Sequence, residues 1–170
     1  AAWKNSSEIP NQIRYLRSNN RIQGSVFFSS KSMMTVARAV GDSLKNDLYK
    51  YQALPPQMPW LDDVAPNQPQ ALTADALKDG VHLKWQQPLK ASDGETASGY
   101  VIYRFTEGEK ISVLDPKNIL KISFKDYVSF IDTSAESGKR YSYLVTALDR
   151  LKNESEPSGP VGVEVPLAKE

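Results

Sequence analysis

The sequence contains no cysteine, a single histidine and no long apolar run. Without cysteine, the chain can form neither a disulfide nor a thiolate metal site, and it has no cysteine nucleophile. A transmembrane helix needs about 20 consecutive apolar residues, and no stretch of this length occurs, so we expect no transmembrane segment. The net charge of +1 is too balanced to indicate a nucleic-acid partner.

Residues 1–65 show helical and strand patterns in alternation, which is typical of βα units. Apolar residues at spacings of three and four predict helices, and a short apolar run flanked by glycine and serine predicts a buried strand. The expected elements are a helix carrying Ile9, Ile13 and Leu16, a strand over Ile22–Ser29, and a second helix. The second helix carries Val36, Val40, Leu44 and Leu48, and either includes its first half or, because Gly41 weakens that half, begins only at Asp42.

One parallel strand cannot make a sheet, because it needs neighbours on both sides. We therefore expect residues 1–65 to be the remnant of a larger α/β domain, and the chain to be a fragment of a longer protein. Leu54–Trp60 contains three prolines, and proline favours a stiff, extended backbone. This stretch is predicted to be the linker to the next domain.

From about residue 66 onward the apolar period changes to two, which predicts strands. Asp-Gly, Glu-Gly and Ser-Gly pairs separate the runs as turn signals. Several short strands within about 100 residues are typical of an immunoglobulin-like sandwich. The clearest alternating runs are Val81–Gln86, Tyr100–Tyr103, Tyr141–Leu148 and Val161–Val165.

Trp85, the stretch Gly99–Arg104 and the alternating run Tyr141–Ala147 resemble the fibronectin type III family, as does the turn Asp149–Ser155. The resemblance implies that residues 66–170 form one mainly β, fibronectin-type-III/immunoglobulin-like sandwich, in which Tyr141 makes the tyrosine corner. The core residues expected on this basis are Trp85, Tyr100, Ile102, Tyr141, Tyr143 and Val145.

Three earlier stretches, Gly24–Ser32, Asp42–Leu44 and Tyr49–Asp62, resemble the end of glycosyl-hydrolase-like family ten proteins. These are (β/α)8-barrel proteins of gut-type and other bacteria, and several carry a fibronectin-type-III-like domain after the barrel. The resemblance implies that residues 1–65 are the last helix-strand-helix of such a barrel. It also implies that the missing barrel belongs to the same polypeptide, and that the protein is secreted, periplasmic or on the cell surface.

The chain is not expected to be an enzyme by itself. A retaining glycosidase needs two carboxyl groups about 5–5.5 Å apart, and the expected barrel strand end at residues 29–31 carries none. The acidic pairs within residues 93–95 and 107–109 fall in predicted turns, and His82 alone supports neither a triad nor a histidine metal site. We therefore expect no catalytic residue, metal or cofactor.

Trp3, Ser30 and Lys31 are the candidate substrate-binding residues of an intact barrel, because strand ends carry barrel sites. The alternative is that Ser30 caps a turn, Lys31 is solvated and Trp3 packs on a helix.

In the strand order that the resemblance to fibronectin type III implies, the third and sixth strands share a sheet. They then present apolar residues on their outward side, where polar residues are usual. Such a patch indicates a docking surface, here for the barrel end or for Met58–Trp60. Alternatively, its residues cover one another or lie under Ile111–Phe124. The residues of this expected interface are Val101, Tyr103, Phe105, Leu144 and Leu148.

The function favoured by these observations is a non-catalytic accessory module that buttresses or spaces the barrel of a glycoside-hydrolase-like protein. One alternative is a carbohydrate-binding module, for which Tyr103, Phe105, Tyr127 and Phe130 are the available stacking residues. The other is a protein-interaction or adhesion domain that uses the apolar face.

Overall fold

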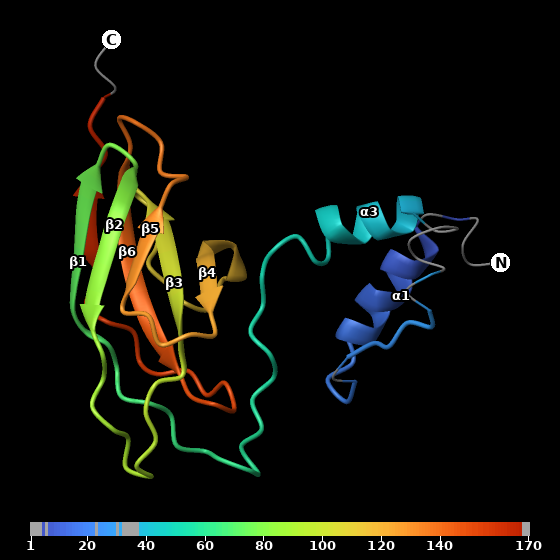
Figure 1. The fold of residues 1–170 in the computed structure, drawn as a ribbon. Helices are drawn as coiled ribbons and strands as arrows, with labels where there is room; N and C mark the ends of the chain where they lie inside the picture. Colours follow the sequence, from blue (N-terminus) through green and yellow to red (C-terminus); the bar gives the residue numbers. More distant parts are fainter. Residues whose placement is uncertain (1–4, 6, 23, 30, 32–37, 168–170) are drawn as a thin grey trace. The chain divides into compact units, whose positions relative to one another are not determined.

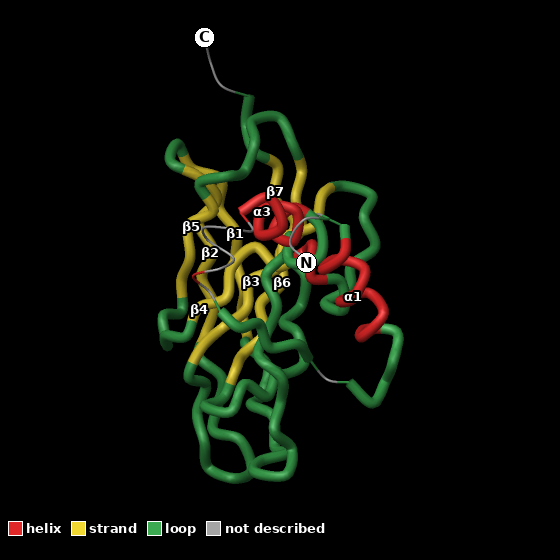
Figure 2. The backbone as a smooth tube through the Cα atoms, turned by 90° about the vertical axis from the view of Figure 1, so that its right-hand side faces the viewer, coloured by secondary structure: helices red, strands yellow, loops and turns green. Residues whose placement is uncertain are grey.

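The protein is described by a computed structural model that covers residues 5, 7–22, 24–29, 31 and 38–167. Its contacts divide it into two compact units, Ala1–Tyr51 and Gln52–Glu170. The α-helices belong to the first unit, and the strands, with a short 3-10 helix at Pro116–Asn118, belong to the second (Figures 1 and 2). The domain boundary expected after residue 65 stays a prediction. No helix in the described ranges has the length and apolar character needed to cross a bilayer.

The first unit is held together by two amphipathic helices, α1 (Glu8–Arg17) and α3 (Arg38–Asn46). Their apolar stripes meet in one small cluster, and Arg14 of α1 forms an ion pair with Asp47 just after α3. The helix α3 begins at or before Arg38 and not at Asp42, so Gly41 does not mark its start. Glycine costs about 1 kcal/mol in a helix interior, but the burial of Val40 and Leu44 on either side of it holds the helix together. The buried members of the cluster are Ile9, Ile13, Val40 and Leu44, with Phe27 and Leu48 packed against them.

The strand expected over Ile22–Ser29 is not formed by the residues described there, which are 22 and 24–29. Val26 is 100% exposed and Phe28 is 97% exposed, and only Phe27 packs against the helices. An extended segment becomes a strand only by hydrogen bonding to a neighbouring strand, and no described strand pairs with this one. The apolar pattern of these residues was therefore not sufficient to predict a strand.

The second unit is a sandwich of two antiparallel sheets, which confirms the predicted fold class (Figure 1). One sheet has the strand order β1-β2-β5 and the other has the order β4-β3-β6-β7. The strands are β1 (Gln70–Leu77), β2 (Gly80–Gln86), β3 (Gly99–Thr106), β4 (Ile119–Ser123), β5 (Ser129–Asp132), β6 (Arg140–Leu148) and β7 (Val161–Glu164).

The core lies between the two sheets and is built on aromatic side chains. Trp85 of β2 meets the ring of Tyr100 of β3 edge to face, with 5.1 Å between the ring centroids, which is a favourable aromatic geometry. The hydroxyl of Tyr141 accepts a hydrogen bond from the backbone N–H of Glu136 at 3.2 Å, which makes a tyrosine corner. The buried members are Val81, Leu83, Trp85, Ala97, Tyr100, Ile102, Tyr141, Tyr143, Val145 and Ala147.

A buried carboxylate joins the two sheets at one end of this core. Asp132 at the end of β5 is 1% exposed, and its Oδ2 accepts hydrogen bonds from Arg104 of β3 and Tyr143 of β6, both at 2.8 Å. Its Oδ1 accepts from the backbone N–H and the hydroxyl of Ser134. Burial alone would raise the pKa of Asp132, but these hydrogen bonds outweigh it and hold the pKa below the usual value.

We expect Asp132→Asn to lower the free energy of unfolding by about 2–4 kcal/mol at pH 7, because Arg104 and Tyr143 lose their charged acceptor. A lowered folded-state pKa means that the carboxylate stabilises the fold above pH ~4, and that this contribution is lost as pH falls through the folded value. Urea unfolding at pH 7 and at pH 3 measures both effects. The exposed Asp75→Asn is the control, with a change within about 0.5 kcal/mol; an equal deficit of Asp132→Asn at both pH values would contradict the assignment.

Candidate functional site

The outer face of the four-stranded sheet is apolar and is covered within the second unit. Val101, Tyr103 and Phe105 alternate with the core residues of β3, and Leu144 and Leu148 do so on β6. These five side chains, named above as an expected interface, are at most 3% exposed. Their cover consists of the partly buried Leu54, Val113, Ile119 and Ile122.

Leu54 belongs to residues 52–67, which we call the leading segment, and which runs up to the first strand. At its start, the side-chain amide of Gln52 donates to the carbonyl of Leu120 at 3.5 Å. At its end, the amide of Asn67 donates to the carbonyls of Leu89 and Lys90 at 3.2 and 2.9 Å. The leading segment is therefore attached to the sandwich along its length rather than only at β1. Within it, Trp60 is 75% exposed.

The strongest of these attachments comes from the turn that follows β6. Asn153 is 5% exposed, and its Nδ2 donates both to the backbone carbonyl of Asp62 at 3.0 Å and to Asp149 Oδ2 at 2.7 Å. The backbone N–H of Asn153 donates in turn to Asp149 Oδ1 at 2.9 Å. Asp149 is 2% exposed, so the pair fixes the amide that holds the leading segment. We call this set of contacts the Asn153 clamp.

A half-buried carboxylate, that of Glu154, stabilises the same face next to the clamp. Oε1 of Glu154 accepts hydrogen bonds from the hydroxyls of Tyr103 and Thr146, both at 2.6 Å. Burial first, and then the neighbouring Glu154 carboxylate, raise the pKa of Tyr103, so its phenol stays protonated and remains a donor. This arrangement supplies the polar partners that Tyr103 and Thr146 need on an otherwise apolar face.

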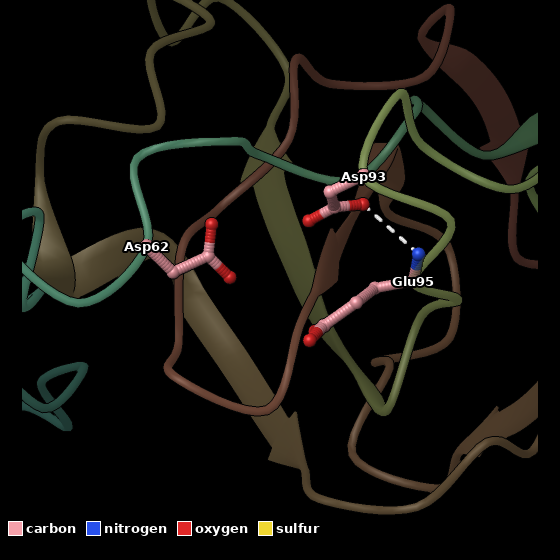
Figure 3. Close-up of side chains that lie close together, drawn as sticks. All are labelled: Asp62, Asp93 and Glu95. Carbon is pink, nitrogen blue, oxygen red and sulfur yellow. Dashed lines mark hydrogen bonds between the residues drawn. The ribbon is translucent and has the colours of Figure 1, made fainter.

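Three carboxylates meet where the leading segment passes the loop between β2 and β3 (Figure 3). Asp62, Asp93 and Glu95 each place one oxygen within 4.8 Å of the others, and oxygen ligands of this kind suit Ca²⁺ or Mg²⁺. However, Glu95 Oε1 already accepts from Arg150 Nε at 2.5 Å, and Asp93 Oδ1 accepts the backbone N–H of Glu95 at 2.9 Å. The guanidinium offsets part of the negative charge that a cation would need, so the cluster is best described as an Arg150–Glu95 ion pair with the Asp62 carboxylate of the leading segment beside it.

The remaining binding and catalytic candidates from the sequence do not form one site among the described residues. Trp3 and Ser30 lie outside the described residues, and Lys31 is exposed in the first unit. His82 of β2 is half-buried and lies 2.7 Å from Asp79 in the β1–β2 turn, and this contact lowers the pKa of Asp79. Of the sugar-stacking candidates, Tyr103 and Phe105 are 1% exposed, whereas Tyr127 is 60% exposed and Phe130 is half-buried.

Sequence reasoning did not find the Asn153 clamp or the carboxylate cluster. Asn153 and Asp62 are 91 positions apart, and no periodicity links them. The available signal was the turn Asp149–Ser155, in which an aspartate and an asparagine four residues apart can bond each other's backbone and side chains.

Residues 69–166 match the family model described as fibronectin type III domain, SaeA third domain. The chain belongs to the fibronectin type III family. The match begins next to β1 and ends just after β7, so the family domain is the sandwich itself. The leading segment lies outside the matched residues, although it belongs to the same compact unit.

Two curated relatives are similar in sequence to this fibronectin type III chain. "Glycosyl hydrolase YngK" of Bacillus subtilis (strain 168) is 37% identical over 159 residues, which is 92% of this chain and 30% of that protein. "Amylopullulanase" of Thermoanaerobacterium saccharolyticum is 38% identical over 101 residues, which is 57% of this chain and 7% of that protein. The chain thus spans less than a third of the length of either relative.

Among solved structures, a fibronectin-type-III-like protein from Clostridium thermocellum matches 62% of this chain and 99% of its own, with 21% identity and a TM-score of 0.45. A β-1,2-glucanase from Parabacteroides distasonis matches 69% of this chain and 14% of its own, with 24% identity and a TM-score of 0.45.

We expect Asn153→Ala to release the leading segment while the core persists. The change leaves the Asp62 carbonyl and Asp149 Oδ2 without their donor, which costs about 1–3 kcal/mol in the free energy of unfolding. In hydrogen exchange, amides of residues 60–64 should lose protection, whereas those of β2 and β5 keep theirs. Gln86→Ala, which removes an exposed amide on β2, should change neither; unaltered exchange at residues 60–64 in Asn153→Ala would refute the clamp.

Proposed function

We propose that this chain is a non-catalytic accessory module of a glycoside-hydrolase-like protein, in which the sandwich braces the polypeptide that precedes it. The observation that carries the proposal is the attachment of the leading segment by Leu54, the Asn153 clamp and Asn67. A module that served only as a passive spacer would not need to hold this segment over so many positions.

The relatives support the setting of the proposal. The alignment with the glycosyl hydrolase of Bacillus subtilis covers 92% of the chain, so it includes most of residues 1–65 as well as the sandwich. We therefore propose that residues 1–65 are the end of a (β/α)8 barrel with its linker, that residues 66–170 are the appended domain, and that the barrel of the same polypeptide is the partner. Trp3, Ser30 and Lys31 stay proposed substrate contacts of that barrel. A protein that acts on polysaccharide in this way would be secreted, periplasmic or on the cell surface.

Bracing has a clear physical basis in this chain. Proline in the leading segment lowers the conformational entropy of the unfolded chain, so that holding the segment costs less. Burial of Leu54 against the apolar face adds a favourable hydrophobic term. A role as an adhesion domain would instead need an open apolar face, and the five residues proposed for it are at most 3% exposed. The covered face therefore favours bracing.

The absence of cysteine permits a direct test with a pair of spin labels. Gln57→Cys in the leading segment and Lys78→Cys in the β1–β2 turn are both exposed positions of the second unit. The distribution of distances between the two spin labels, measured by pulsed electron paramagnetic resonance, should be narrow when no other residue is changed. It should broaden when Leu54→Ser and Asn153→Ala are added, because the contacts that fix the segment are removed.

The matched control for this experiment is Leu114→Ser, the same chemical change at a residue that is 90% exposed. It should leave the distribution narrow. A distribution that is already broad without the two destabilising changes would overturn the bracing role, since the segment would then be free while the sandwich is folded.

A further inference from the structure

An apolar groove opens at the edge of the sandwich where β4 and β5 end their sheets. Each of these strands is an edge strand, and residues 124–128 connect them. The groove encloses about 460 Å³. We call it the β4–β5 groove. Its apolar lining consists of Trp85, Ile102, Ile122, Phe124, Tyr127 and Phe130.

Two aromatic rings stand exposed at this groove. Phe124 is 54% exposed and Tyr127 is 60% exposed, and both belong to the short connection between β4 and β5. Exposed aromatic side chains gathered at a groove mark a binding surface more often than a chance arrangement. Each presents a π-face, on which an apolar ligand surface can stack.

The groove also offers polar groups at its wall. Ser123 and Ser129 line it with hydroxyl groups, each of which can donate and accept a hydrogen bond. This wall therefore favours a ligand that carries hydroxyl groups.

Positive charge surrounds the aromatic rings. Lys121 and Lys125 line the groove, and Lys125 Nζ lies 5.4 Å from the ring centroid of Tyr127. Lys152 Nζ lies 4.9 Å from the ring centroid of Phe124. None of these lysines forms an ion pair with a carboxylate in the described part of the chain, and Asp126 is the acidic residue in the connection. The groove therefore complements a negative ligand.

We propose that the β4–β5 groove binds an acidic saccharide chain. The C–H face of a pyranose ring stacks on Tyr127 and Phe124, and its carboxylate lies between Lys121 and Lys125. Sugar hydroxyls meet the serine hydroxyls of the rim. A purely apolar ligand would leave the lysines without counter-charge, and a neutral sugar would use only the rings. This role goes beyond bracing and does not depend on it, since none of the groove residues belongs to the leading segment.

Affinity electrophoresis of the folded 170-residue chain tests the proposal, with polygalacturonate or alginate as acidic polysaccharide, dextran as neutral polysaccharide and polyglutamate as acidic peptide. We expect retardation by the two polyuronates, and about tenfold weaker binding in Tyr127→Ala, which corresponds to about 1.4 kcal/mol. Phe124→Ala should weaken binding of the polyuronates to a similar extent. The double change Lys121→Gln with Lys125→Gln should weaken binding and flatten its salt dependence.

Matched control variants distinguish binding at the groove from non-specific binding. Trp60→Ala removes an aromatic ring that is 75% exposed outside the groove, and Lys78→Gln with Lys90→Gln removes two charges elsewhere; both should bind like the native chain. Circular dichroism confirms that each variant is folded. Absence of retardation by polyuronates, equal retardation by polyglutamate or dextran, or equal losses in the controls would each overturn the proposal. The spin-label distances decide bracing separately, so failure of either idea is recognisable.

Discussion

The packing of two sheets around Trp85 and Tyr100, closed at one end by Asp132, is the constraint on which the rest of this structure depends. Apolar contacts between β2 and β3 are not directional, so they allow more than one alignment of the sheets. The hydrogen bonds of the Asp132 carboxylate with Arg104 and Tyr143 form in only one alignment. Burial supplies most of the driving force. The charged hydrogen bonds select which alignment of the sheets is retained, because a buried carboxylate without its donors is costly.

Packing of the two sheets buries only one face of each sheet, and the strands β3 and β6 carry apolar residues on both faces. Their outer side chains would be exposed if the domain ended at its strands. The leading segment and residues 111–122 remove that exposure, so a stretch that lies outside the family match is part of the folded unit. Bracing of the preceding chain then follows from the same burial that completes the sandwich.

The opposite arrangement occurs at the edge where β4 and β5 end the two sheets. Here the rings of Phe124 and Tyr127 are left exposed, with lysines beside them and serine hydroxyls at the same groove. The outer face of the four-stranded sheet is thus covered by the chain itself, whereas the groove at β4 and β5 is left open. A bracing surface and a ligand groove are compatible on one sandwich because Phe124, Tyr127 and the groove lysines are not among the residues that hold the leading segment, although Ile122 belongs to both.

The sequence by itself determined the sandwich, since an alternation of period two with a tryptophan and a tyrosine corner depends on local order and is visible residue by residue. It also placed Val101, Tyr103 and Leu144 on one outward side, because alternation assigns faces. Only the tertiary structure decided what covers that side, as Asn153 and Asp62 meet across 91 positions. The same limit explains why the residues described within Ile22–Ser29 do not form the strand expected there. Burial and strand pairing depend on residues that are close in space but distant in sequence. The apolar pattern of a segment shows that it would be stabilised by such neighbours, but not whether they are present.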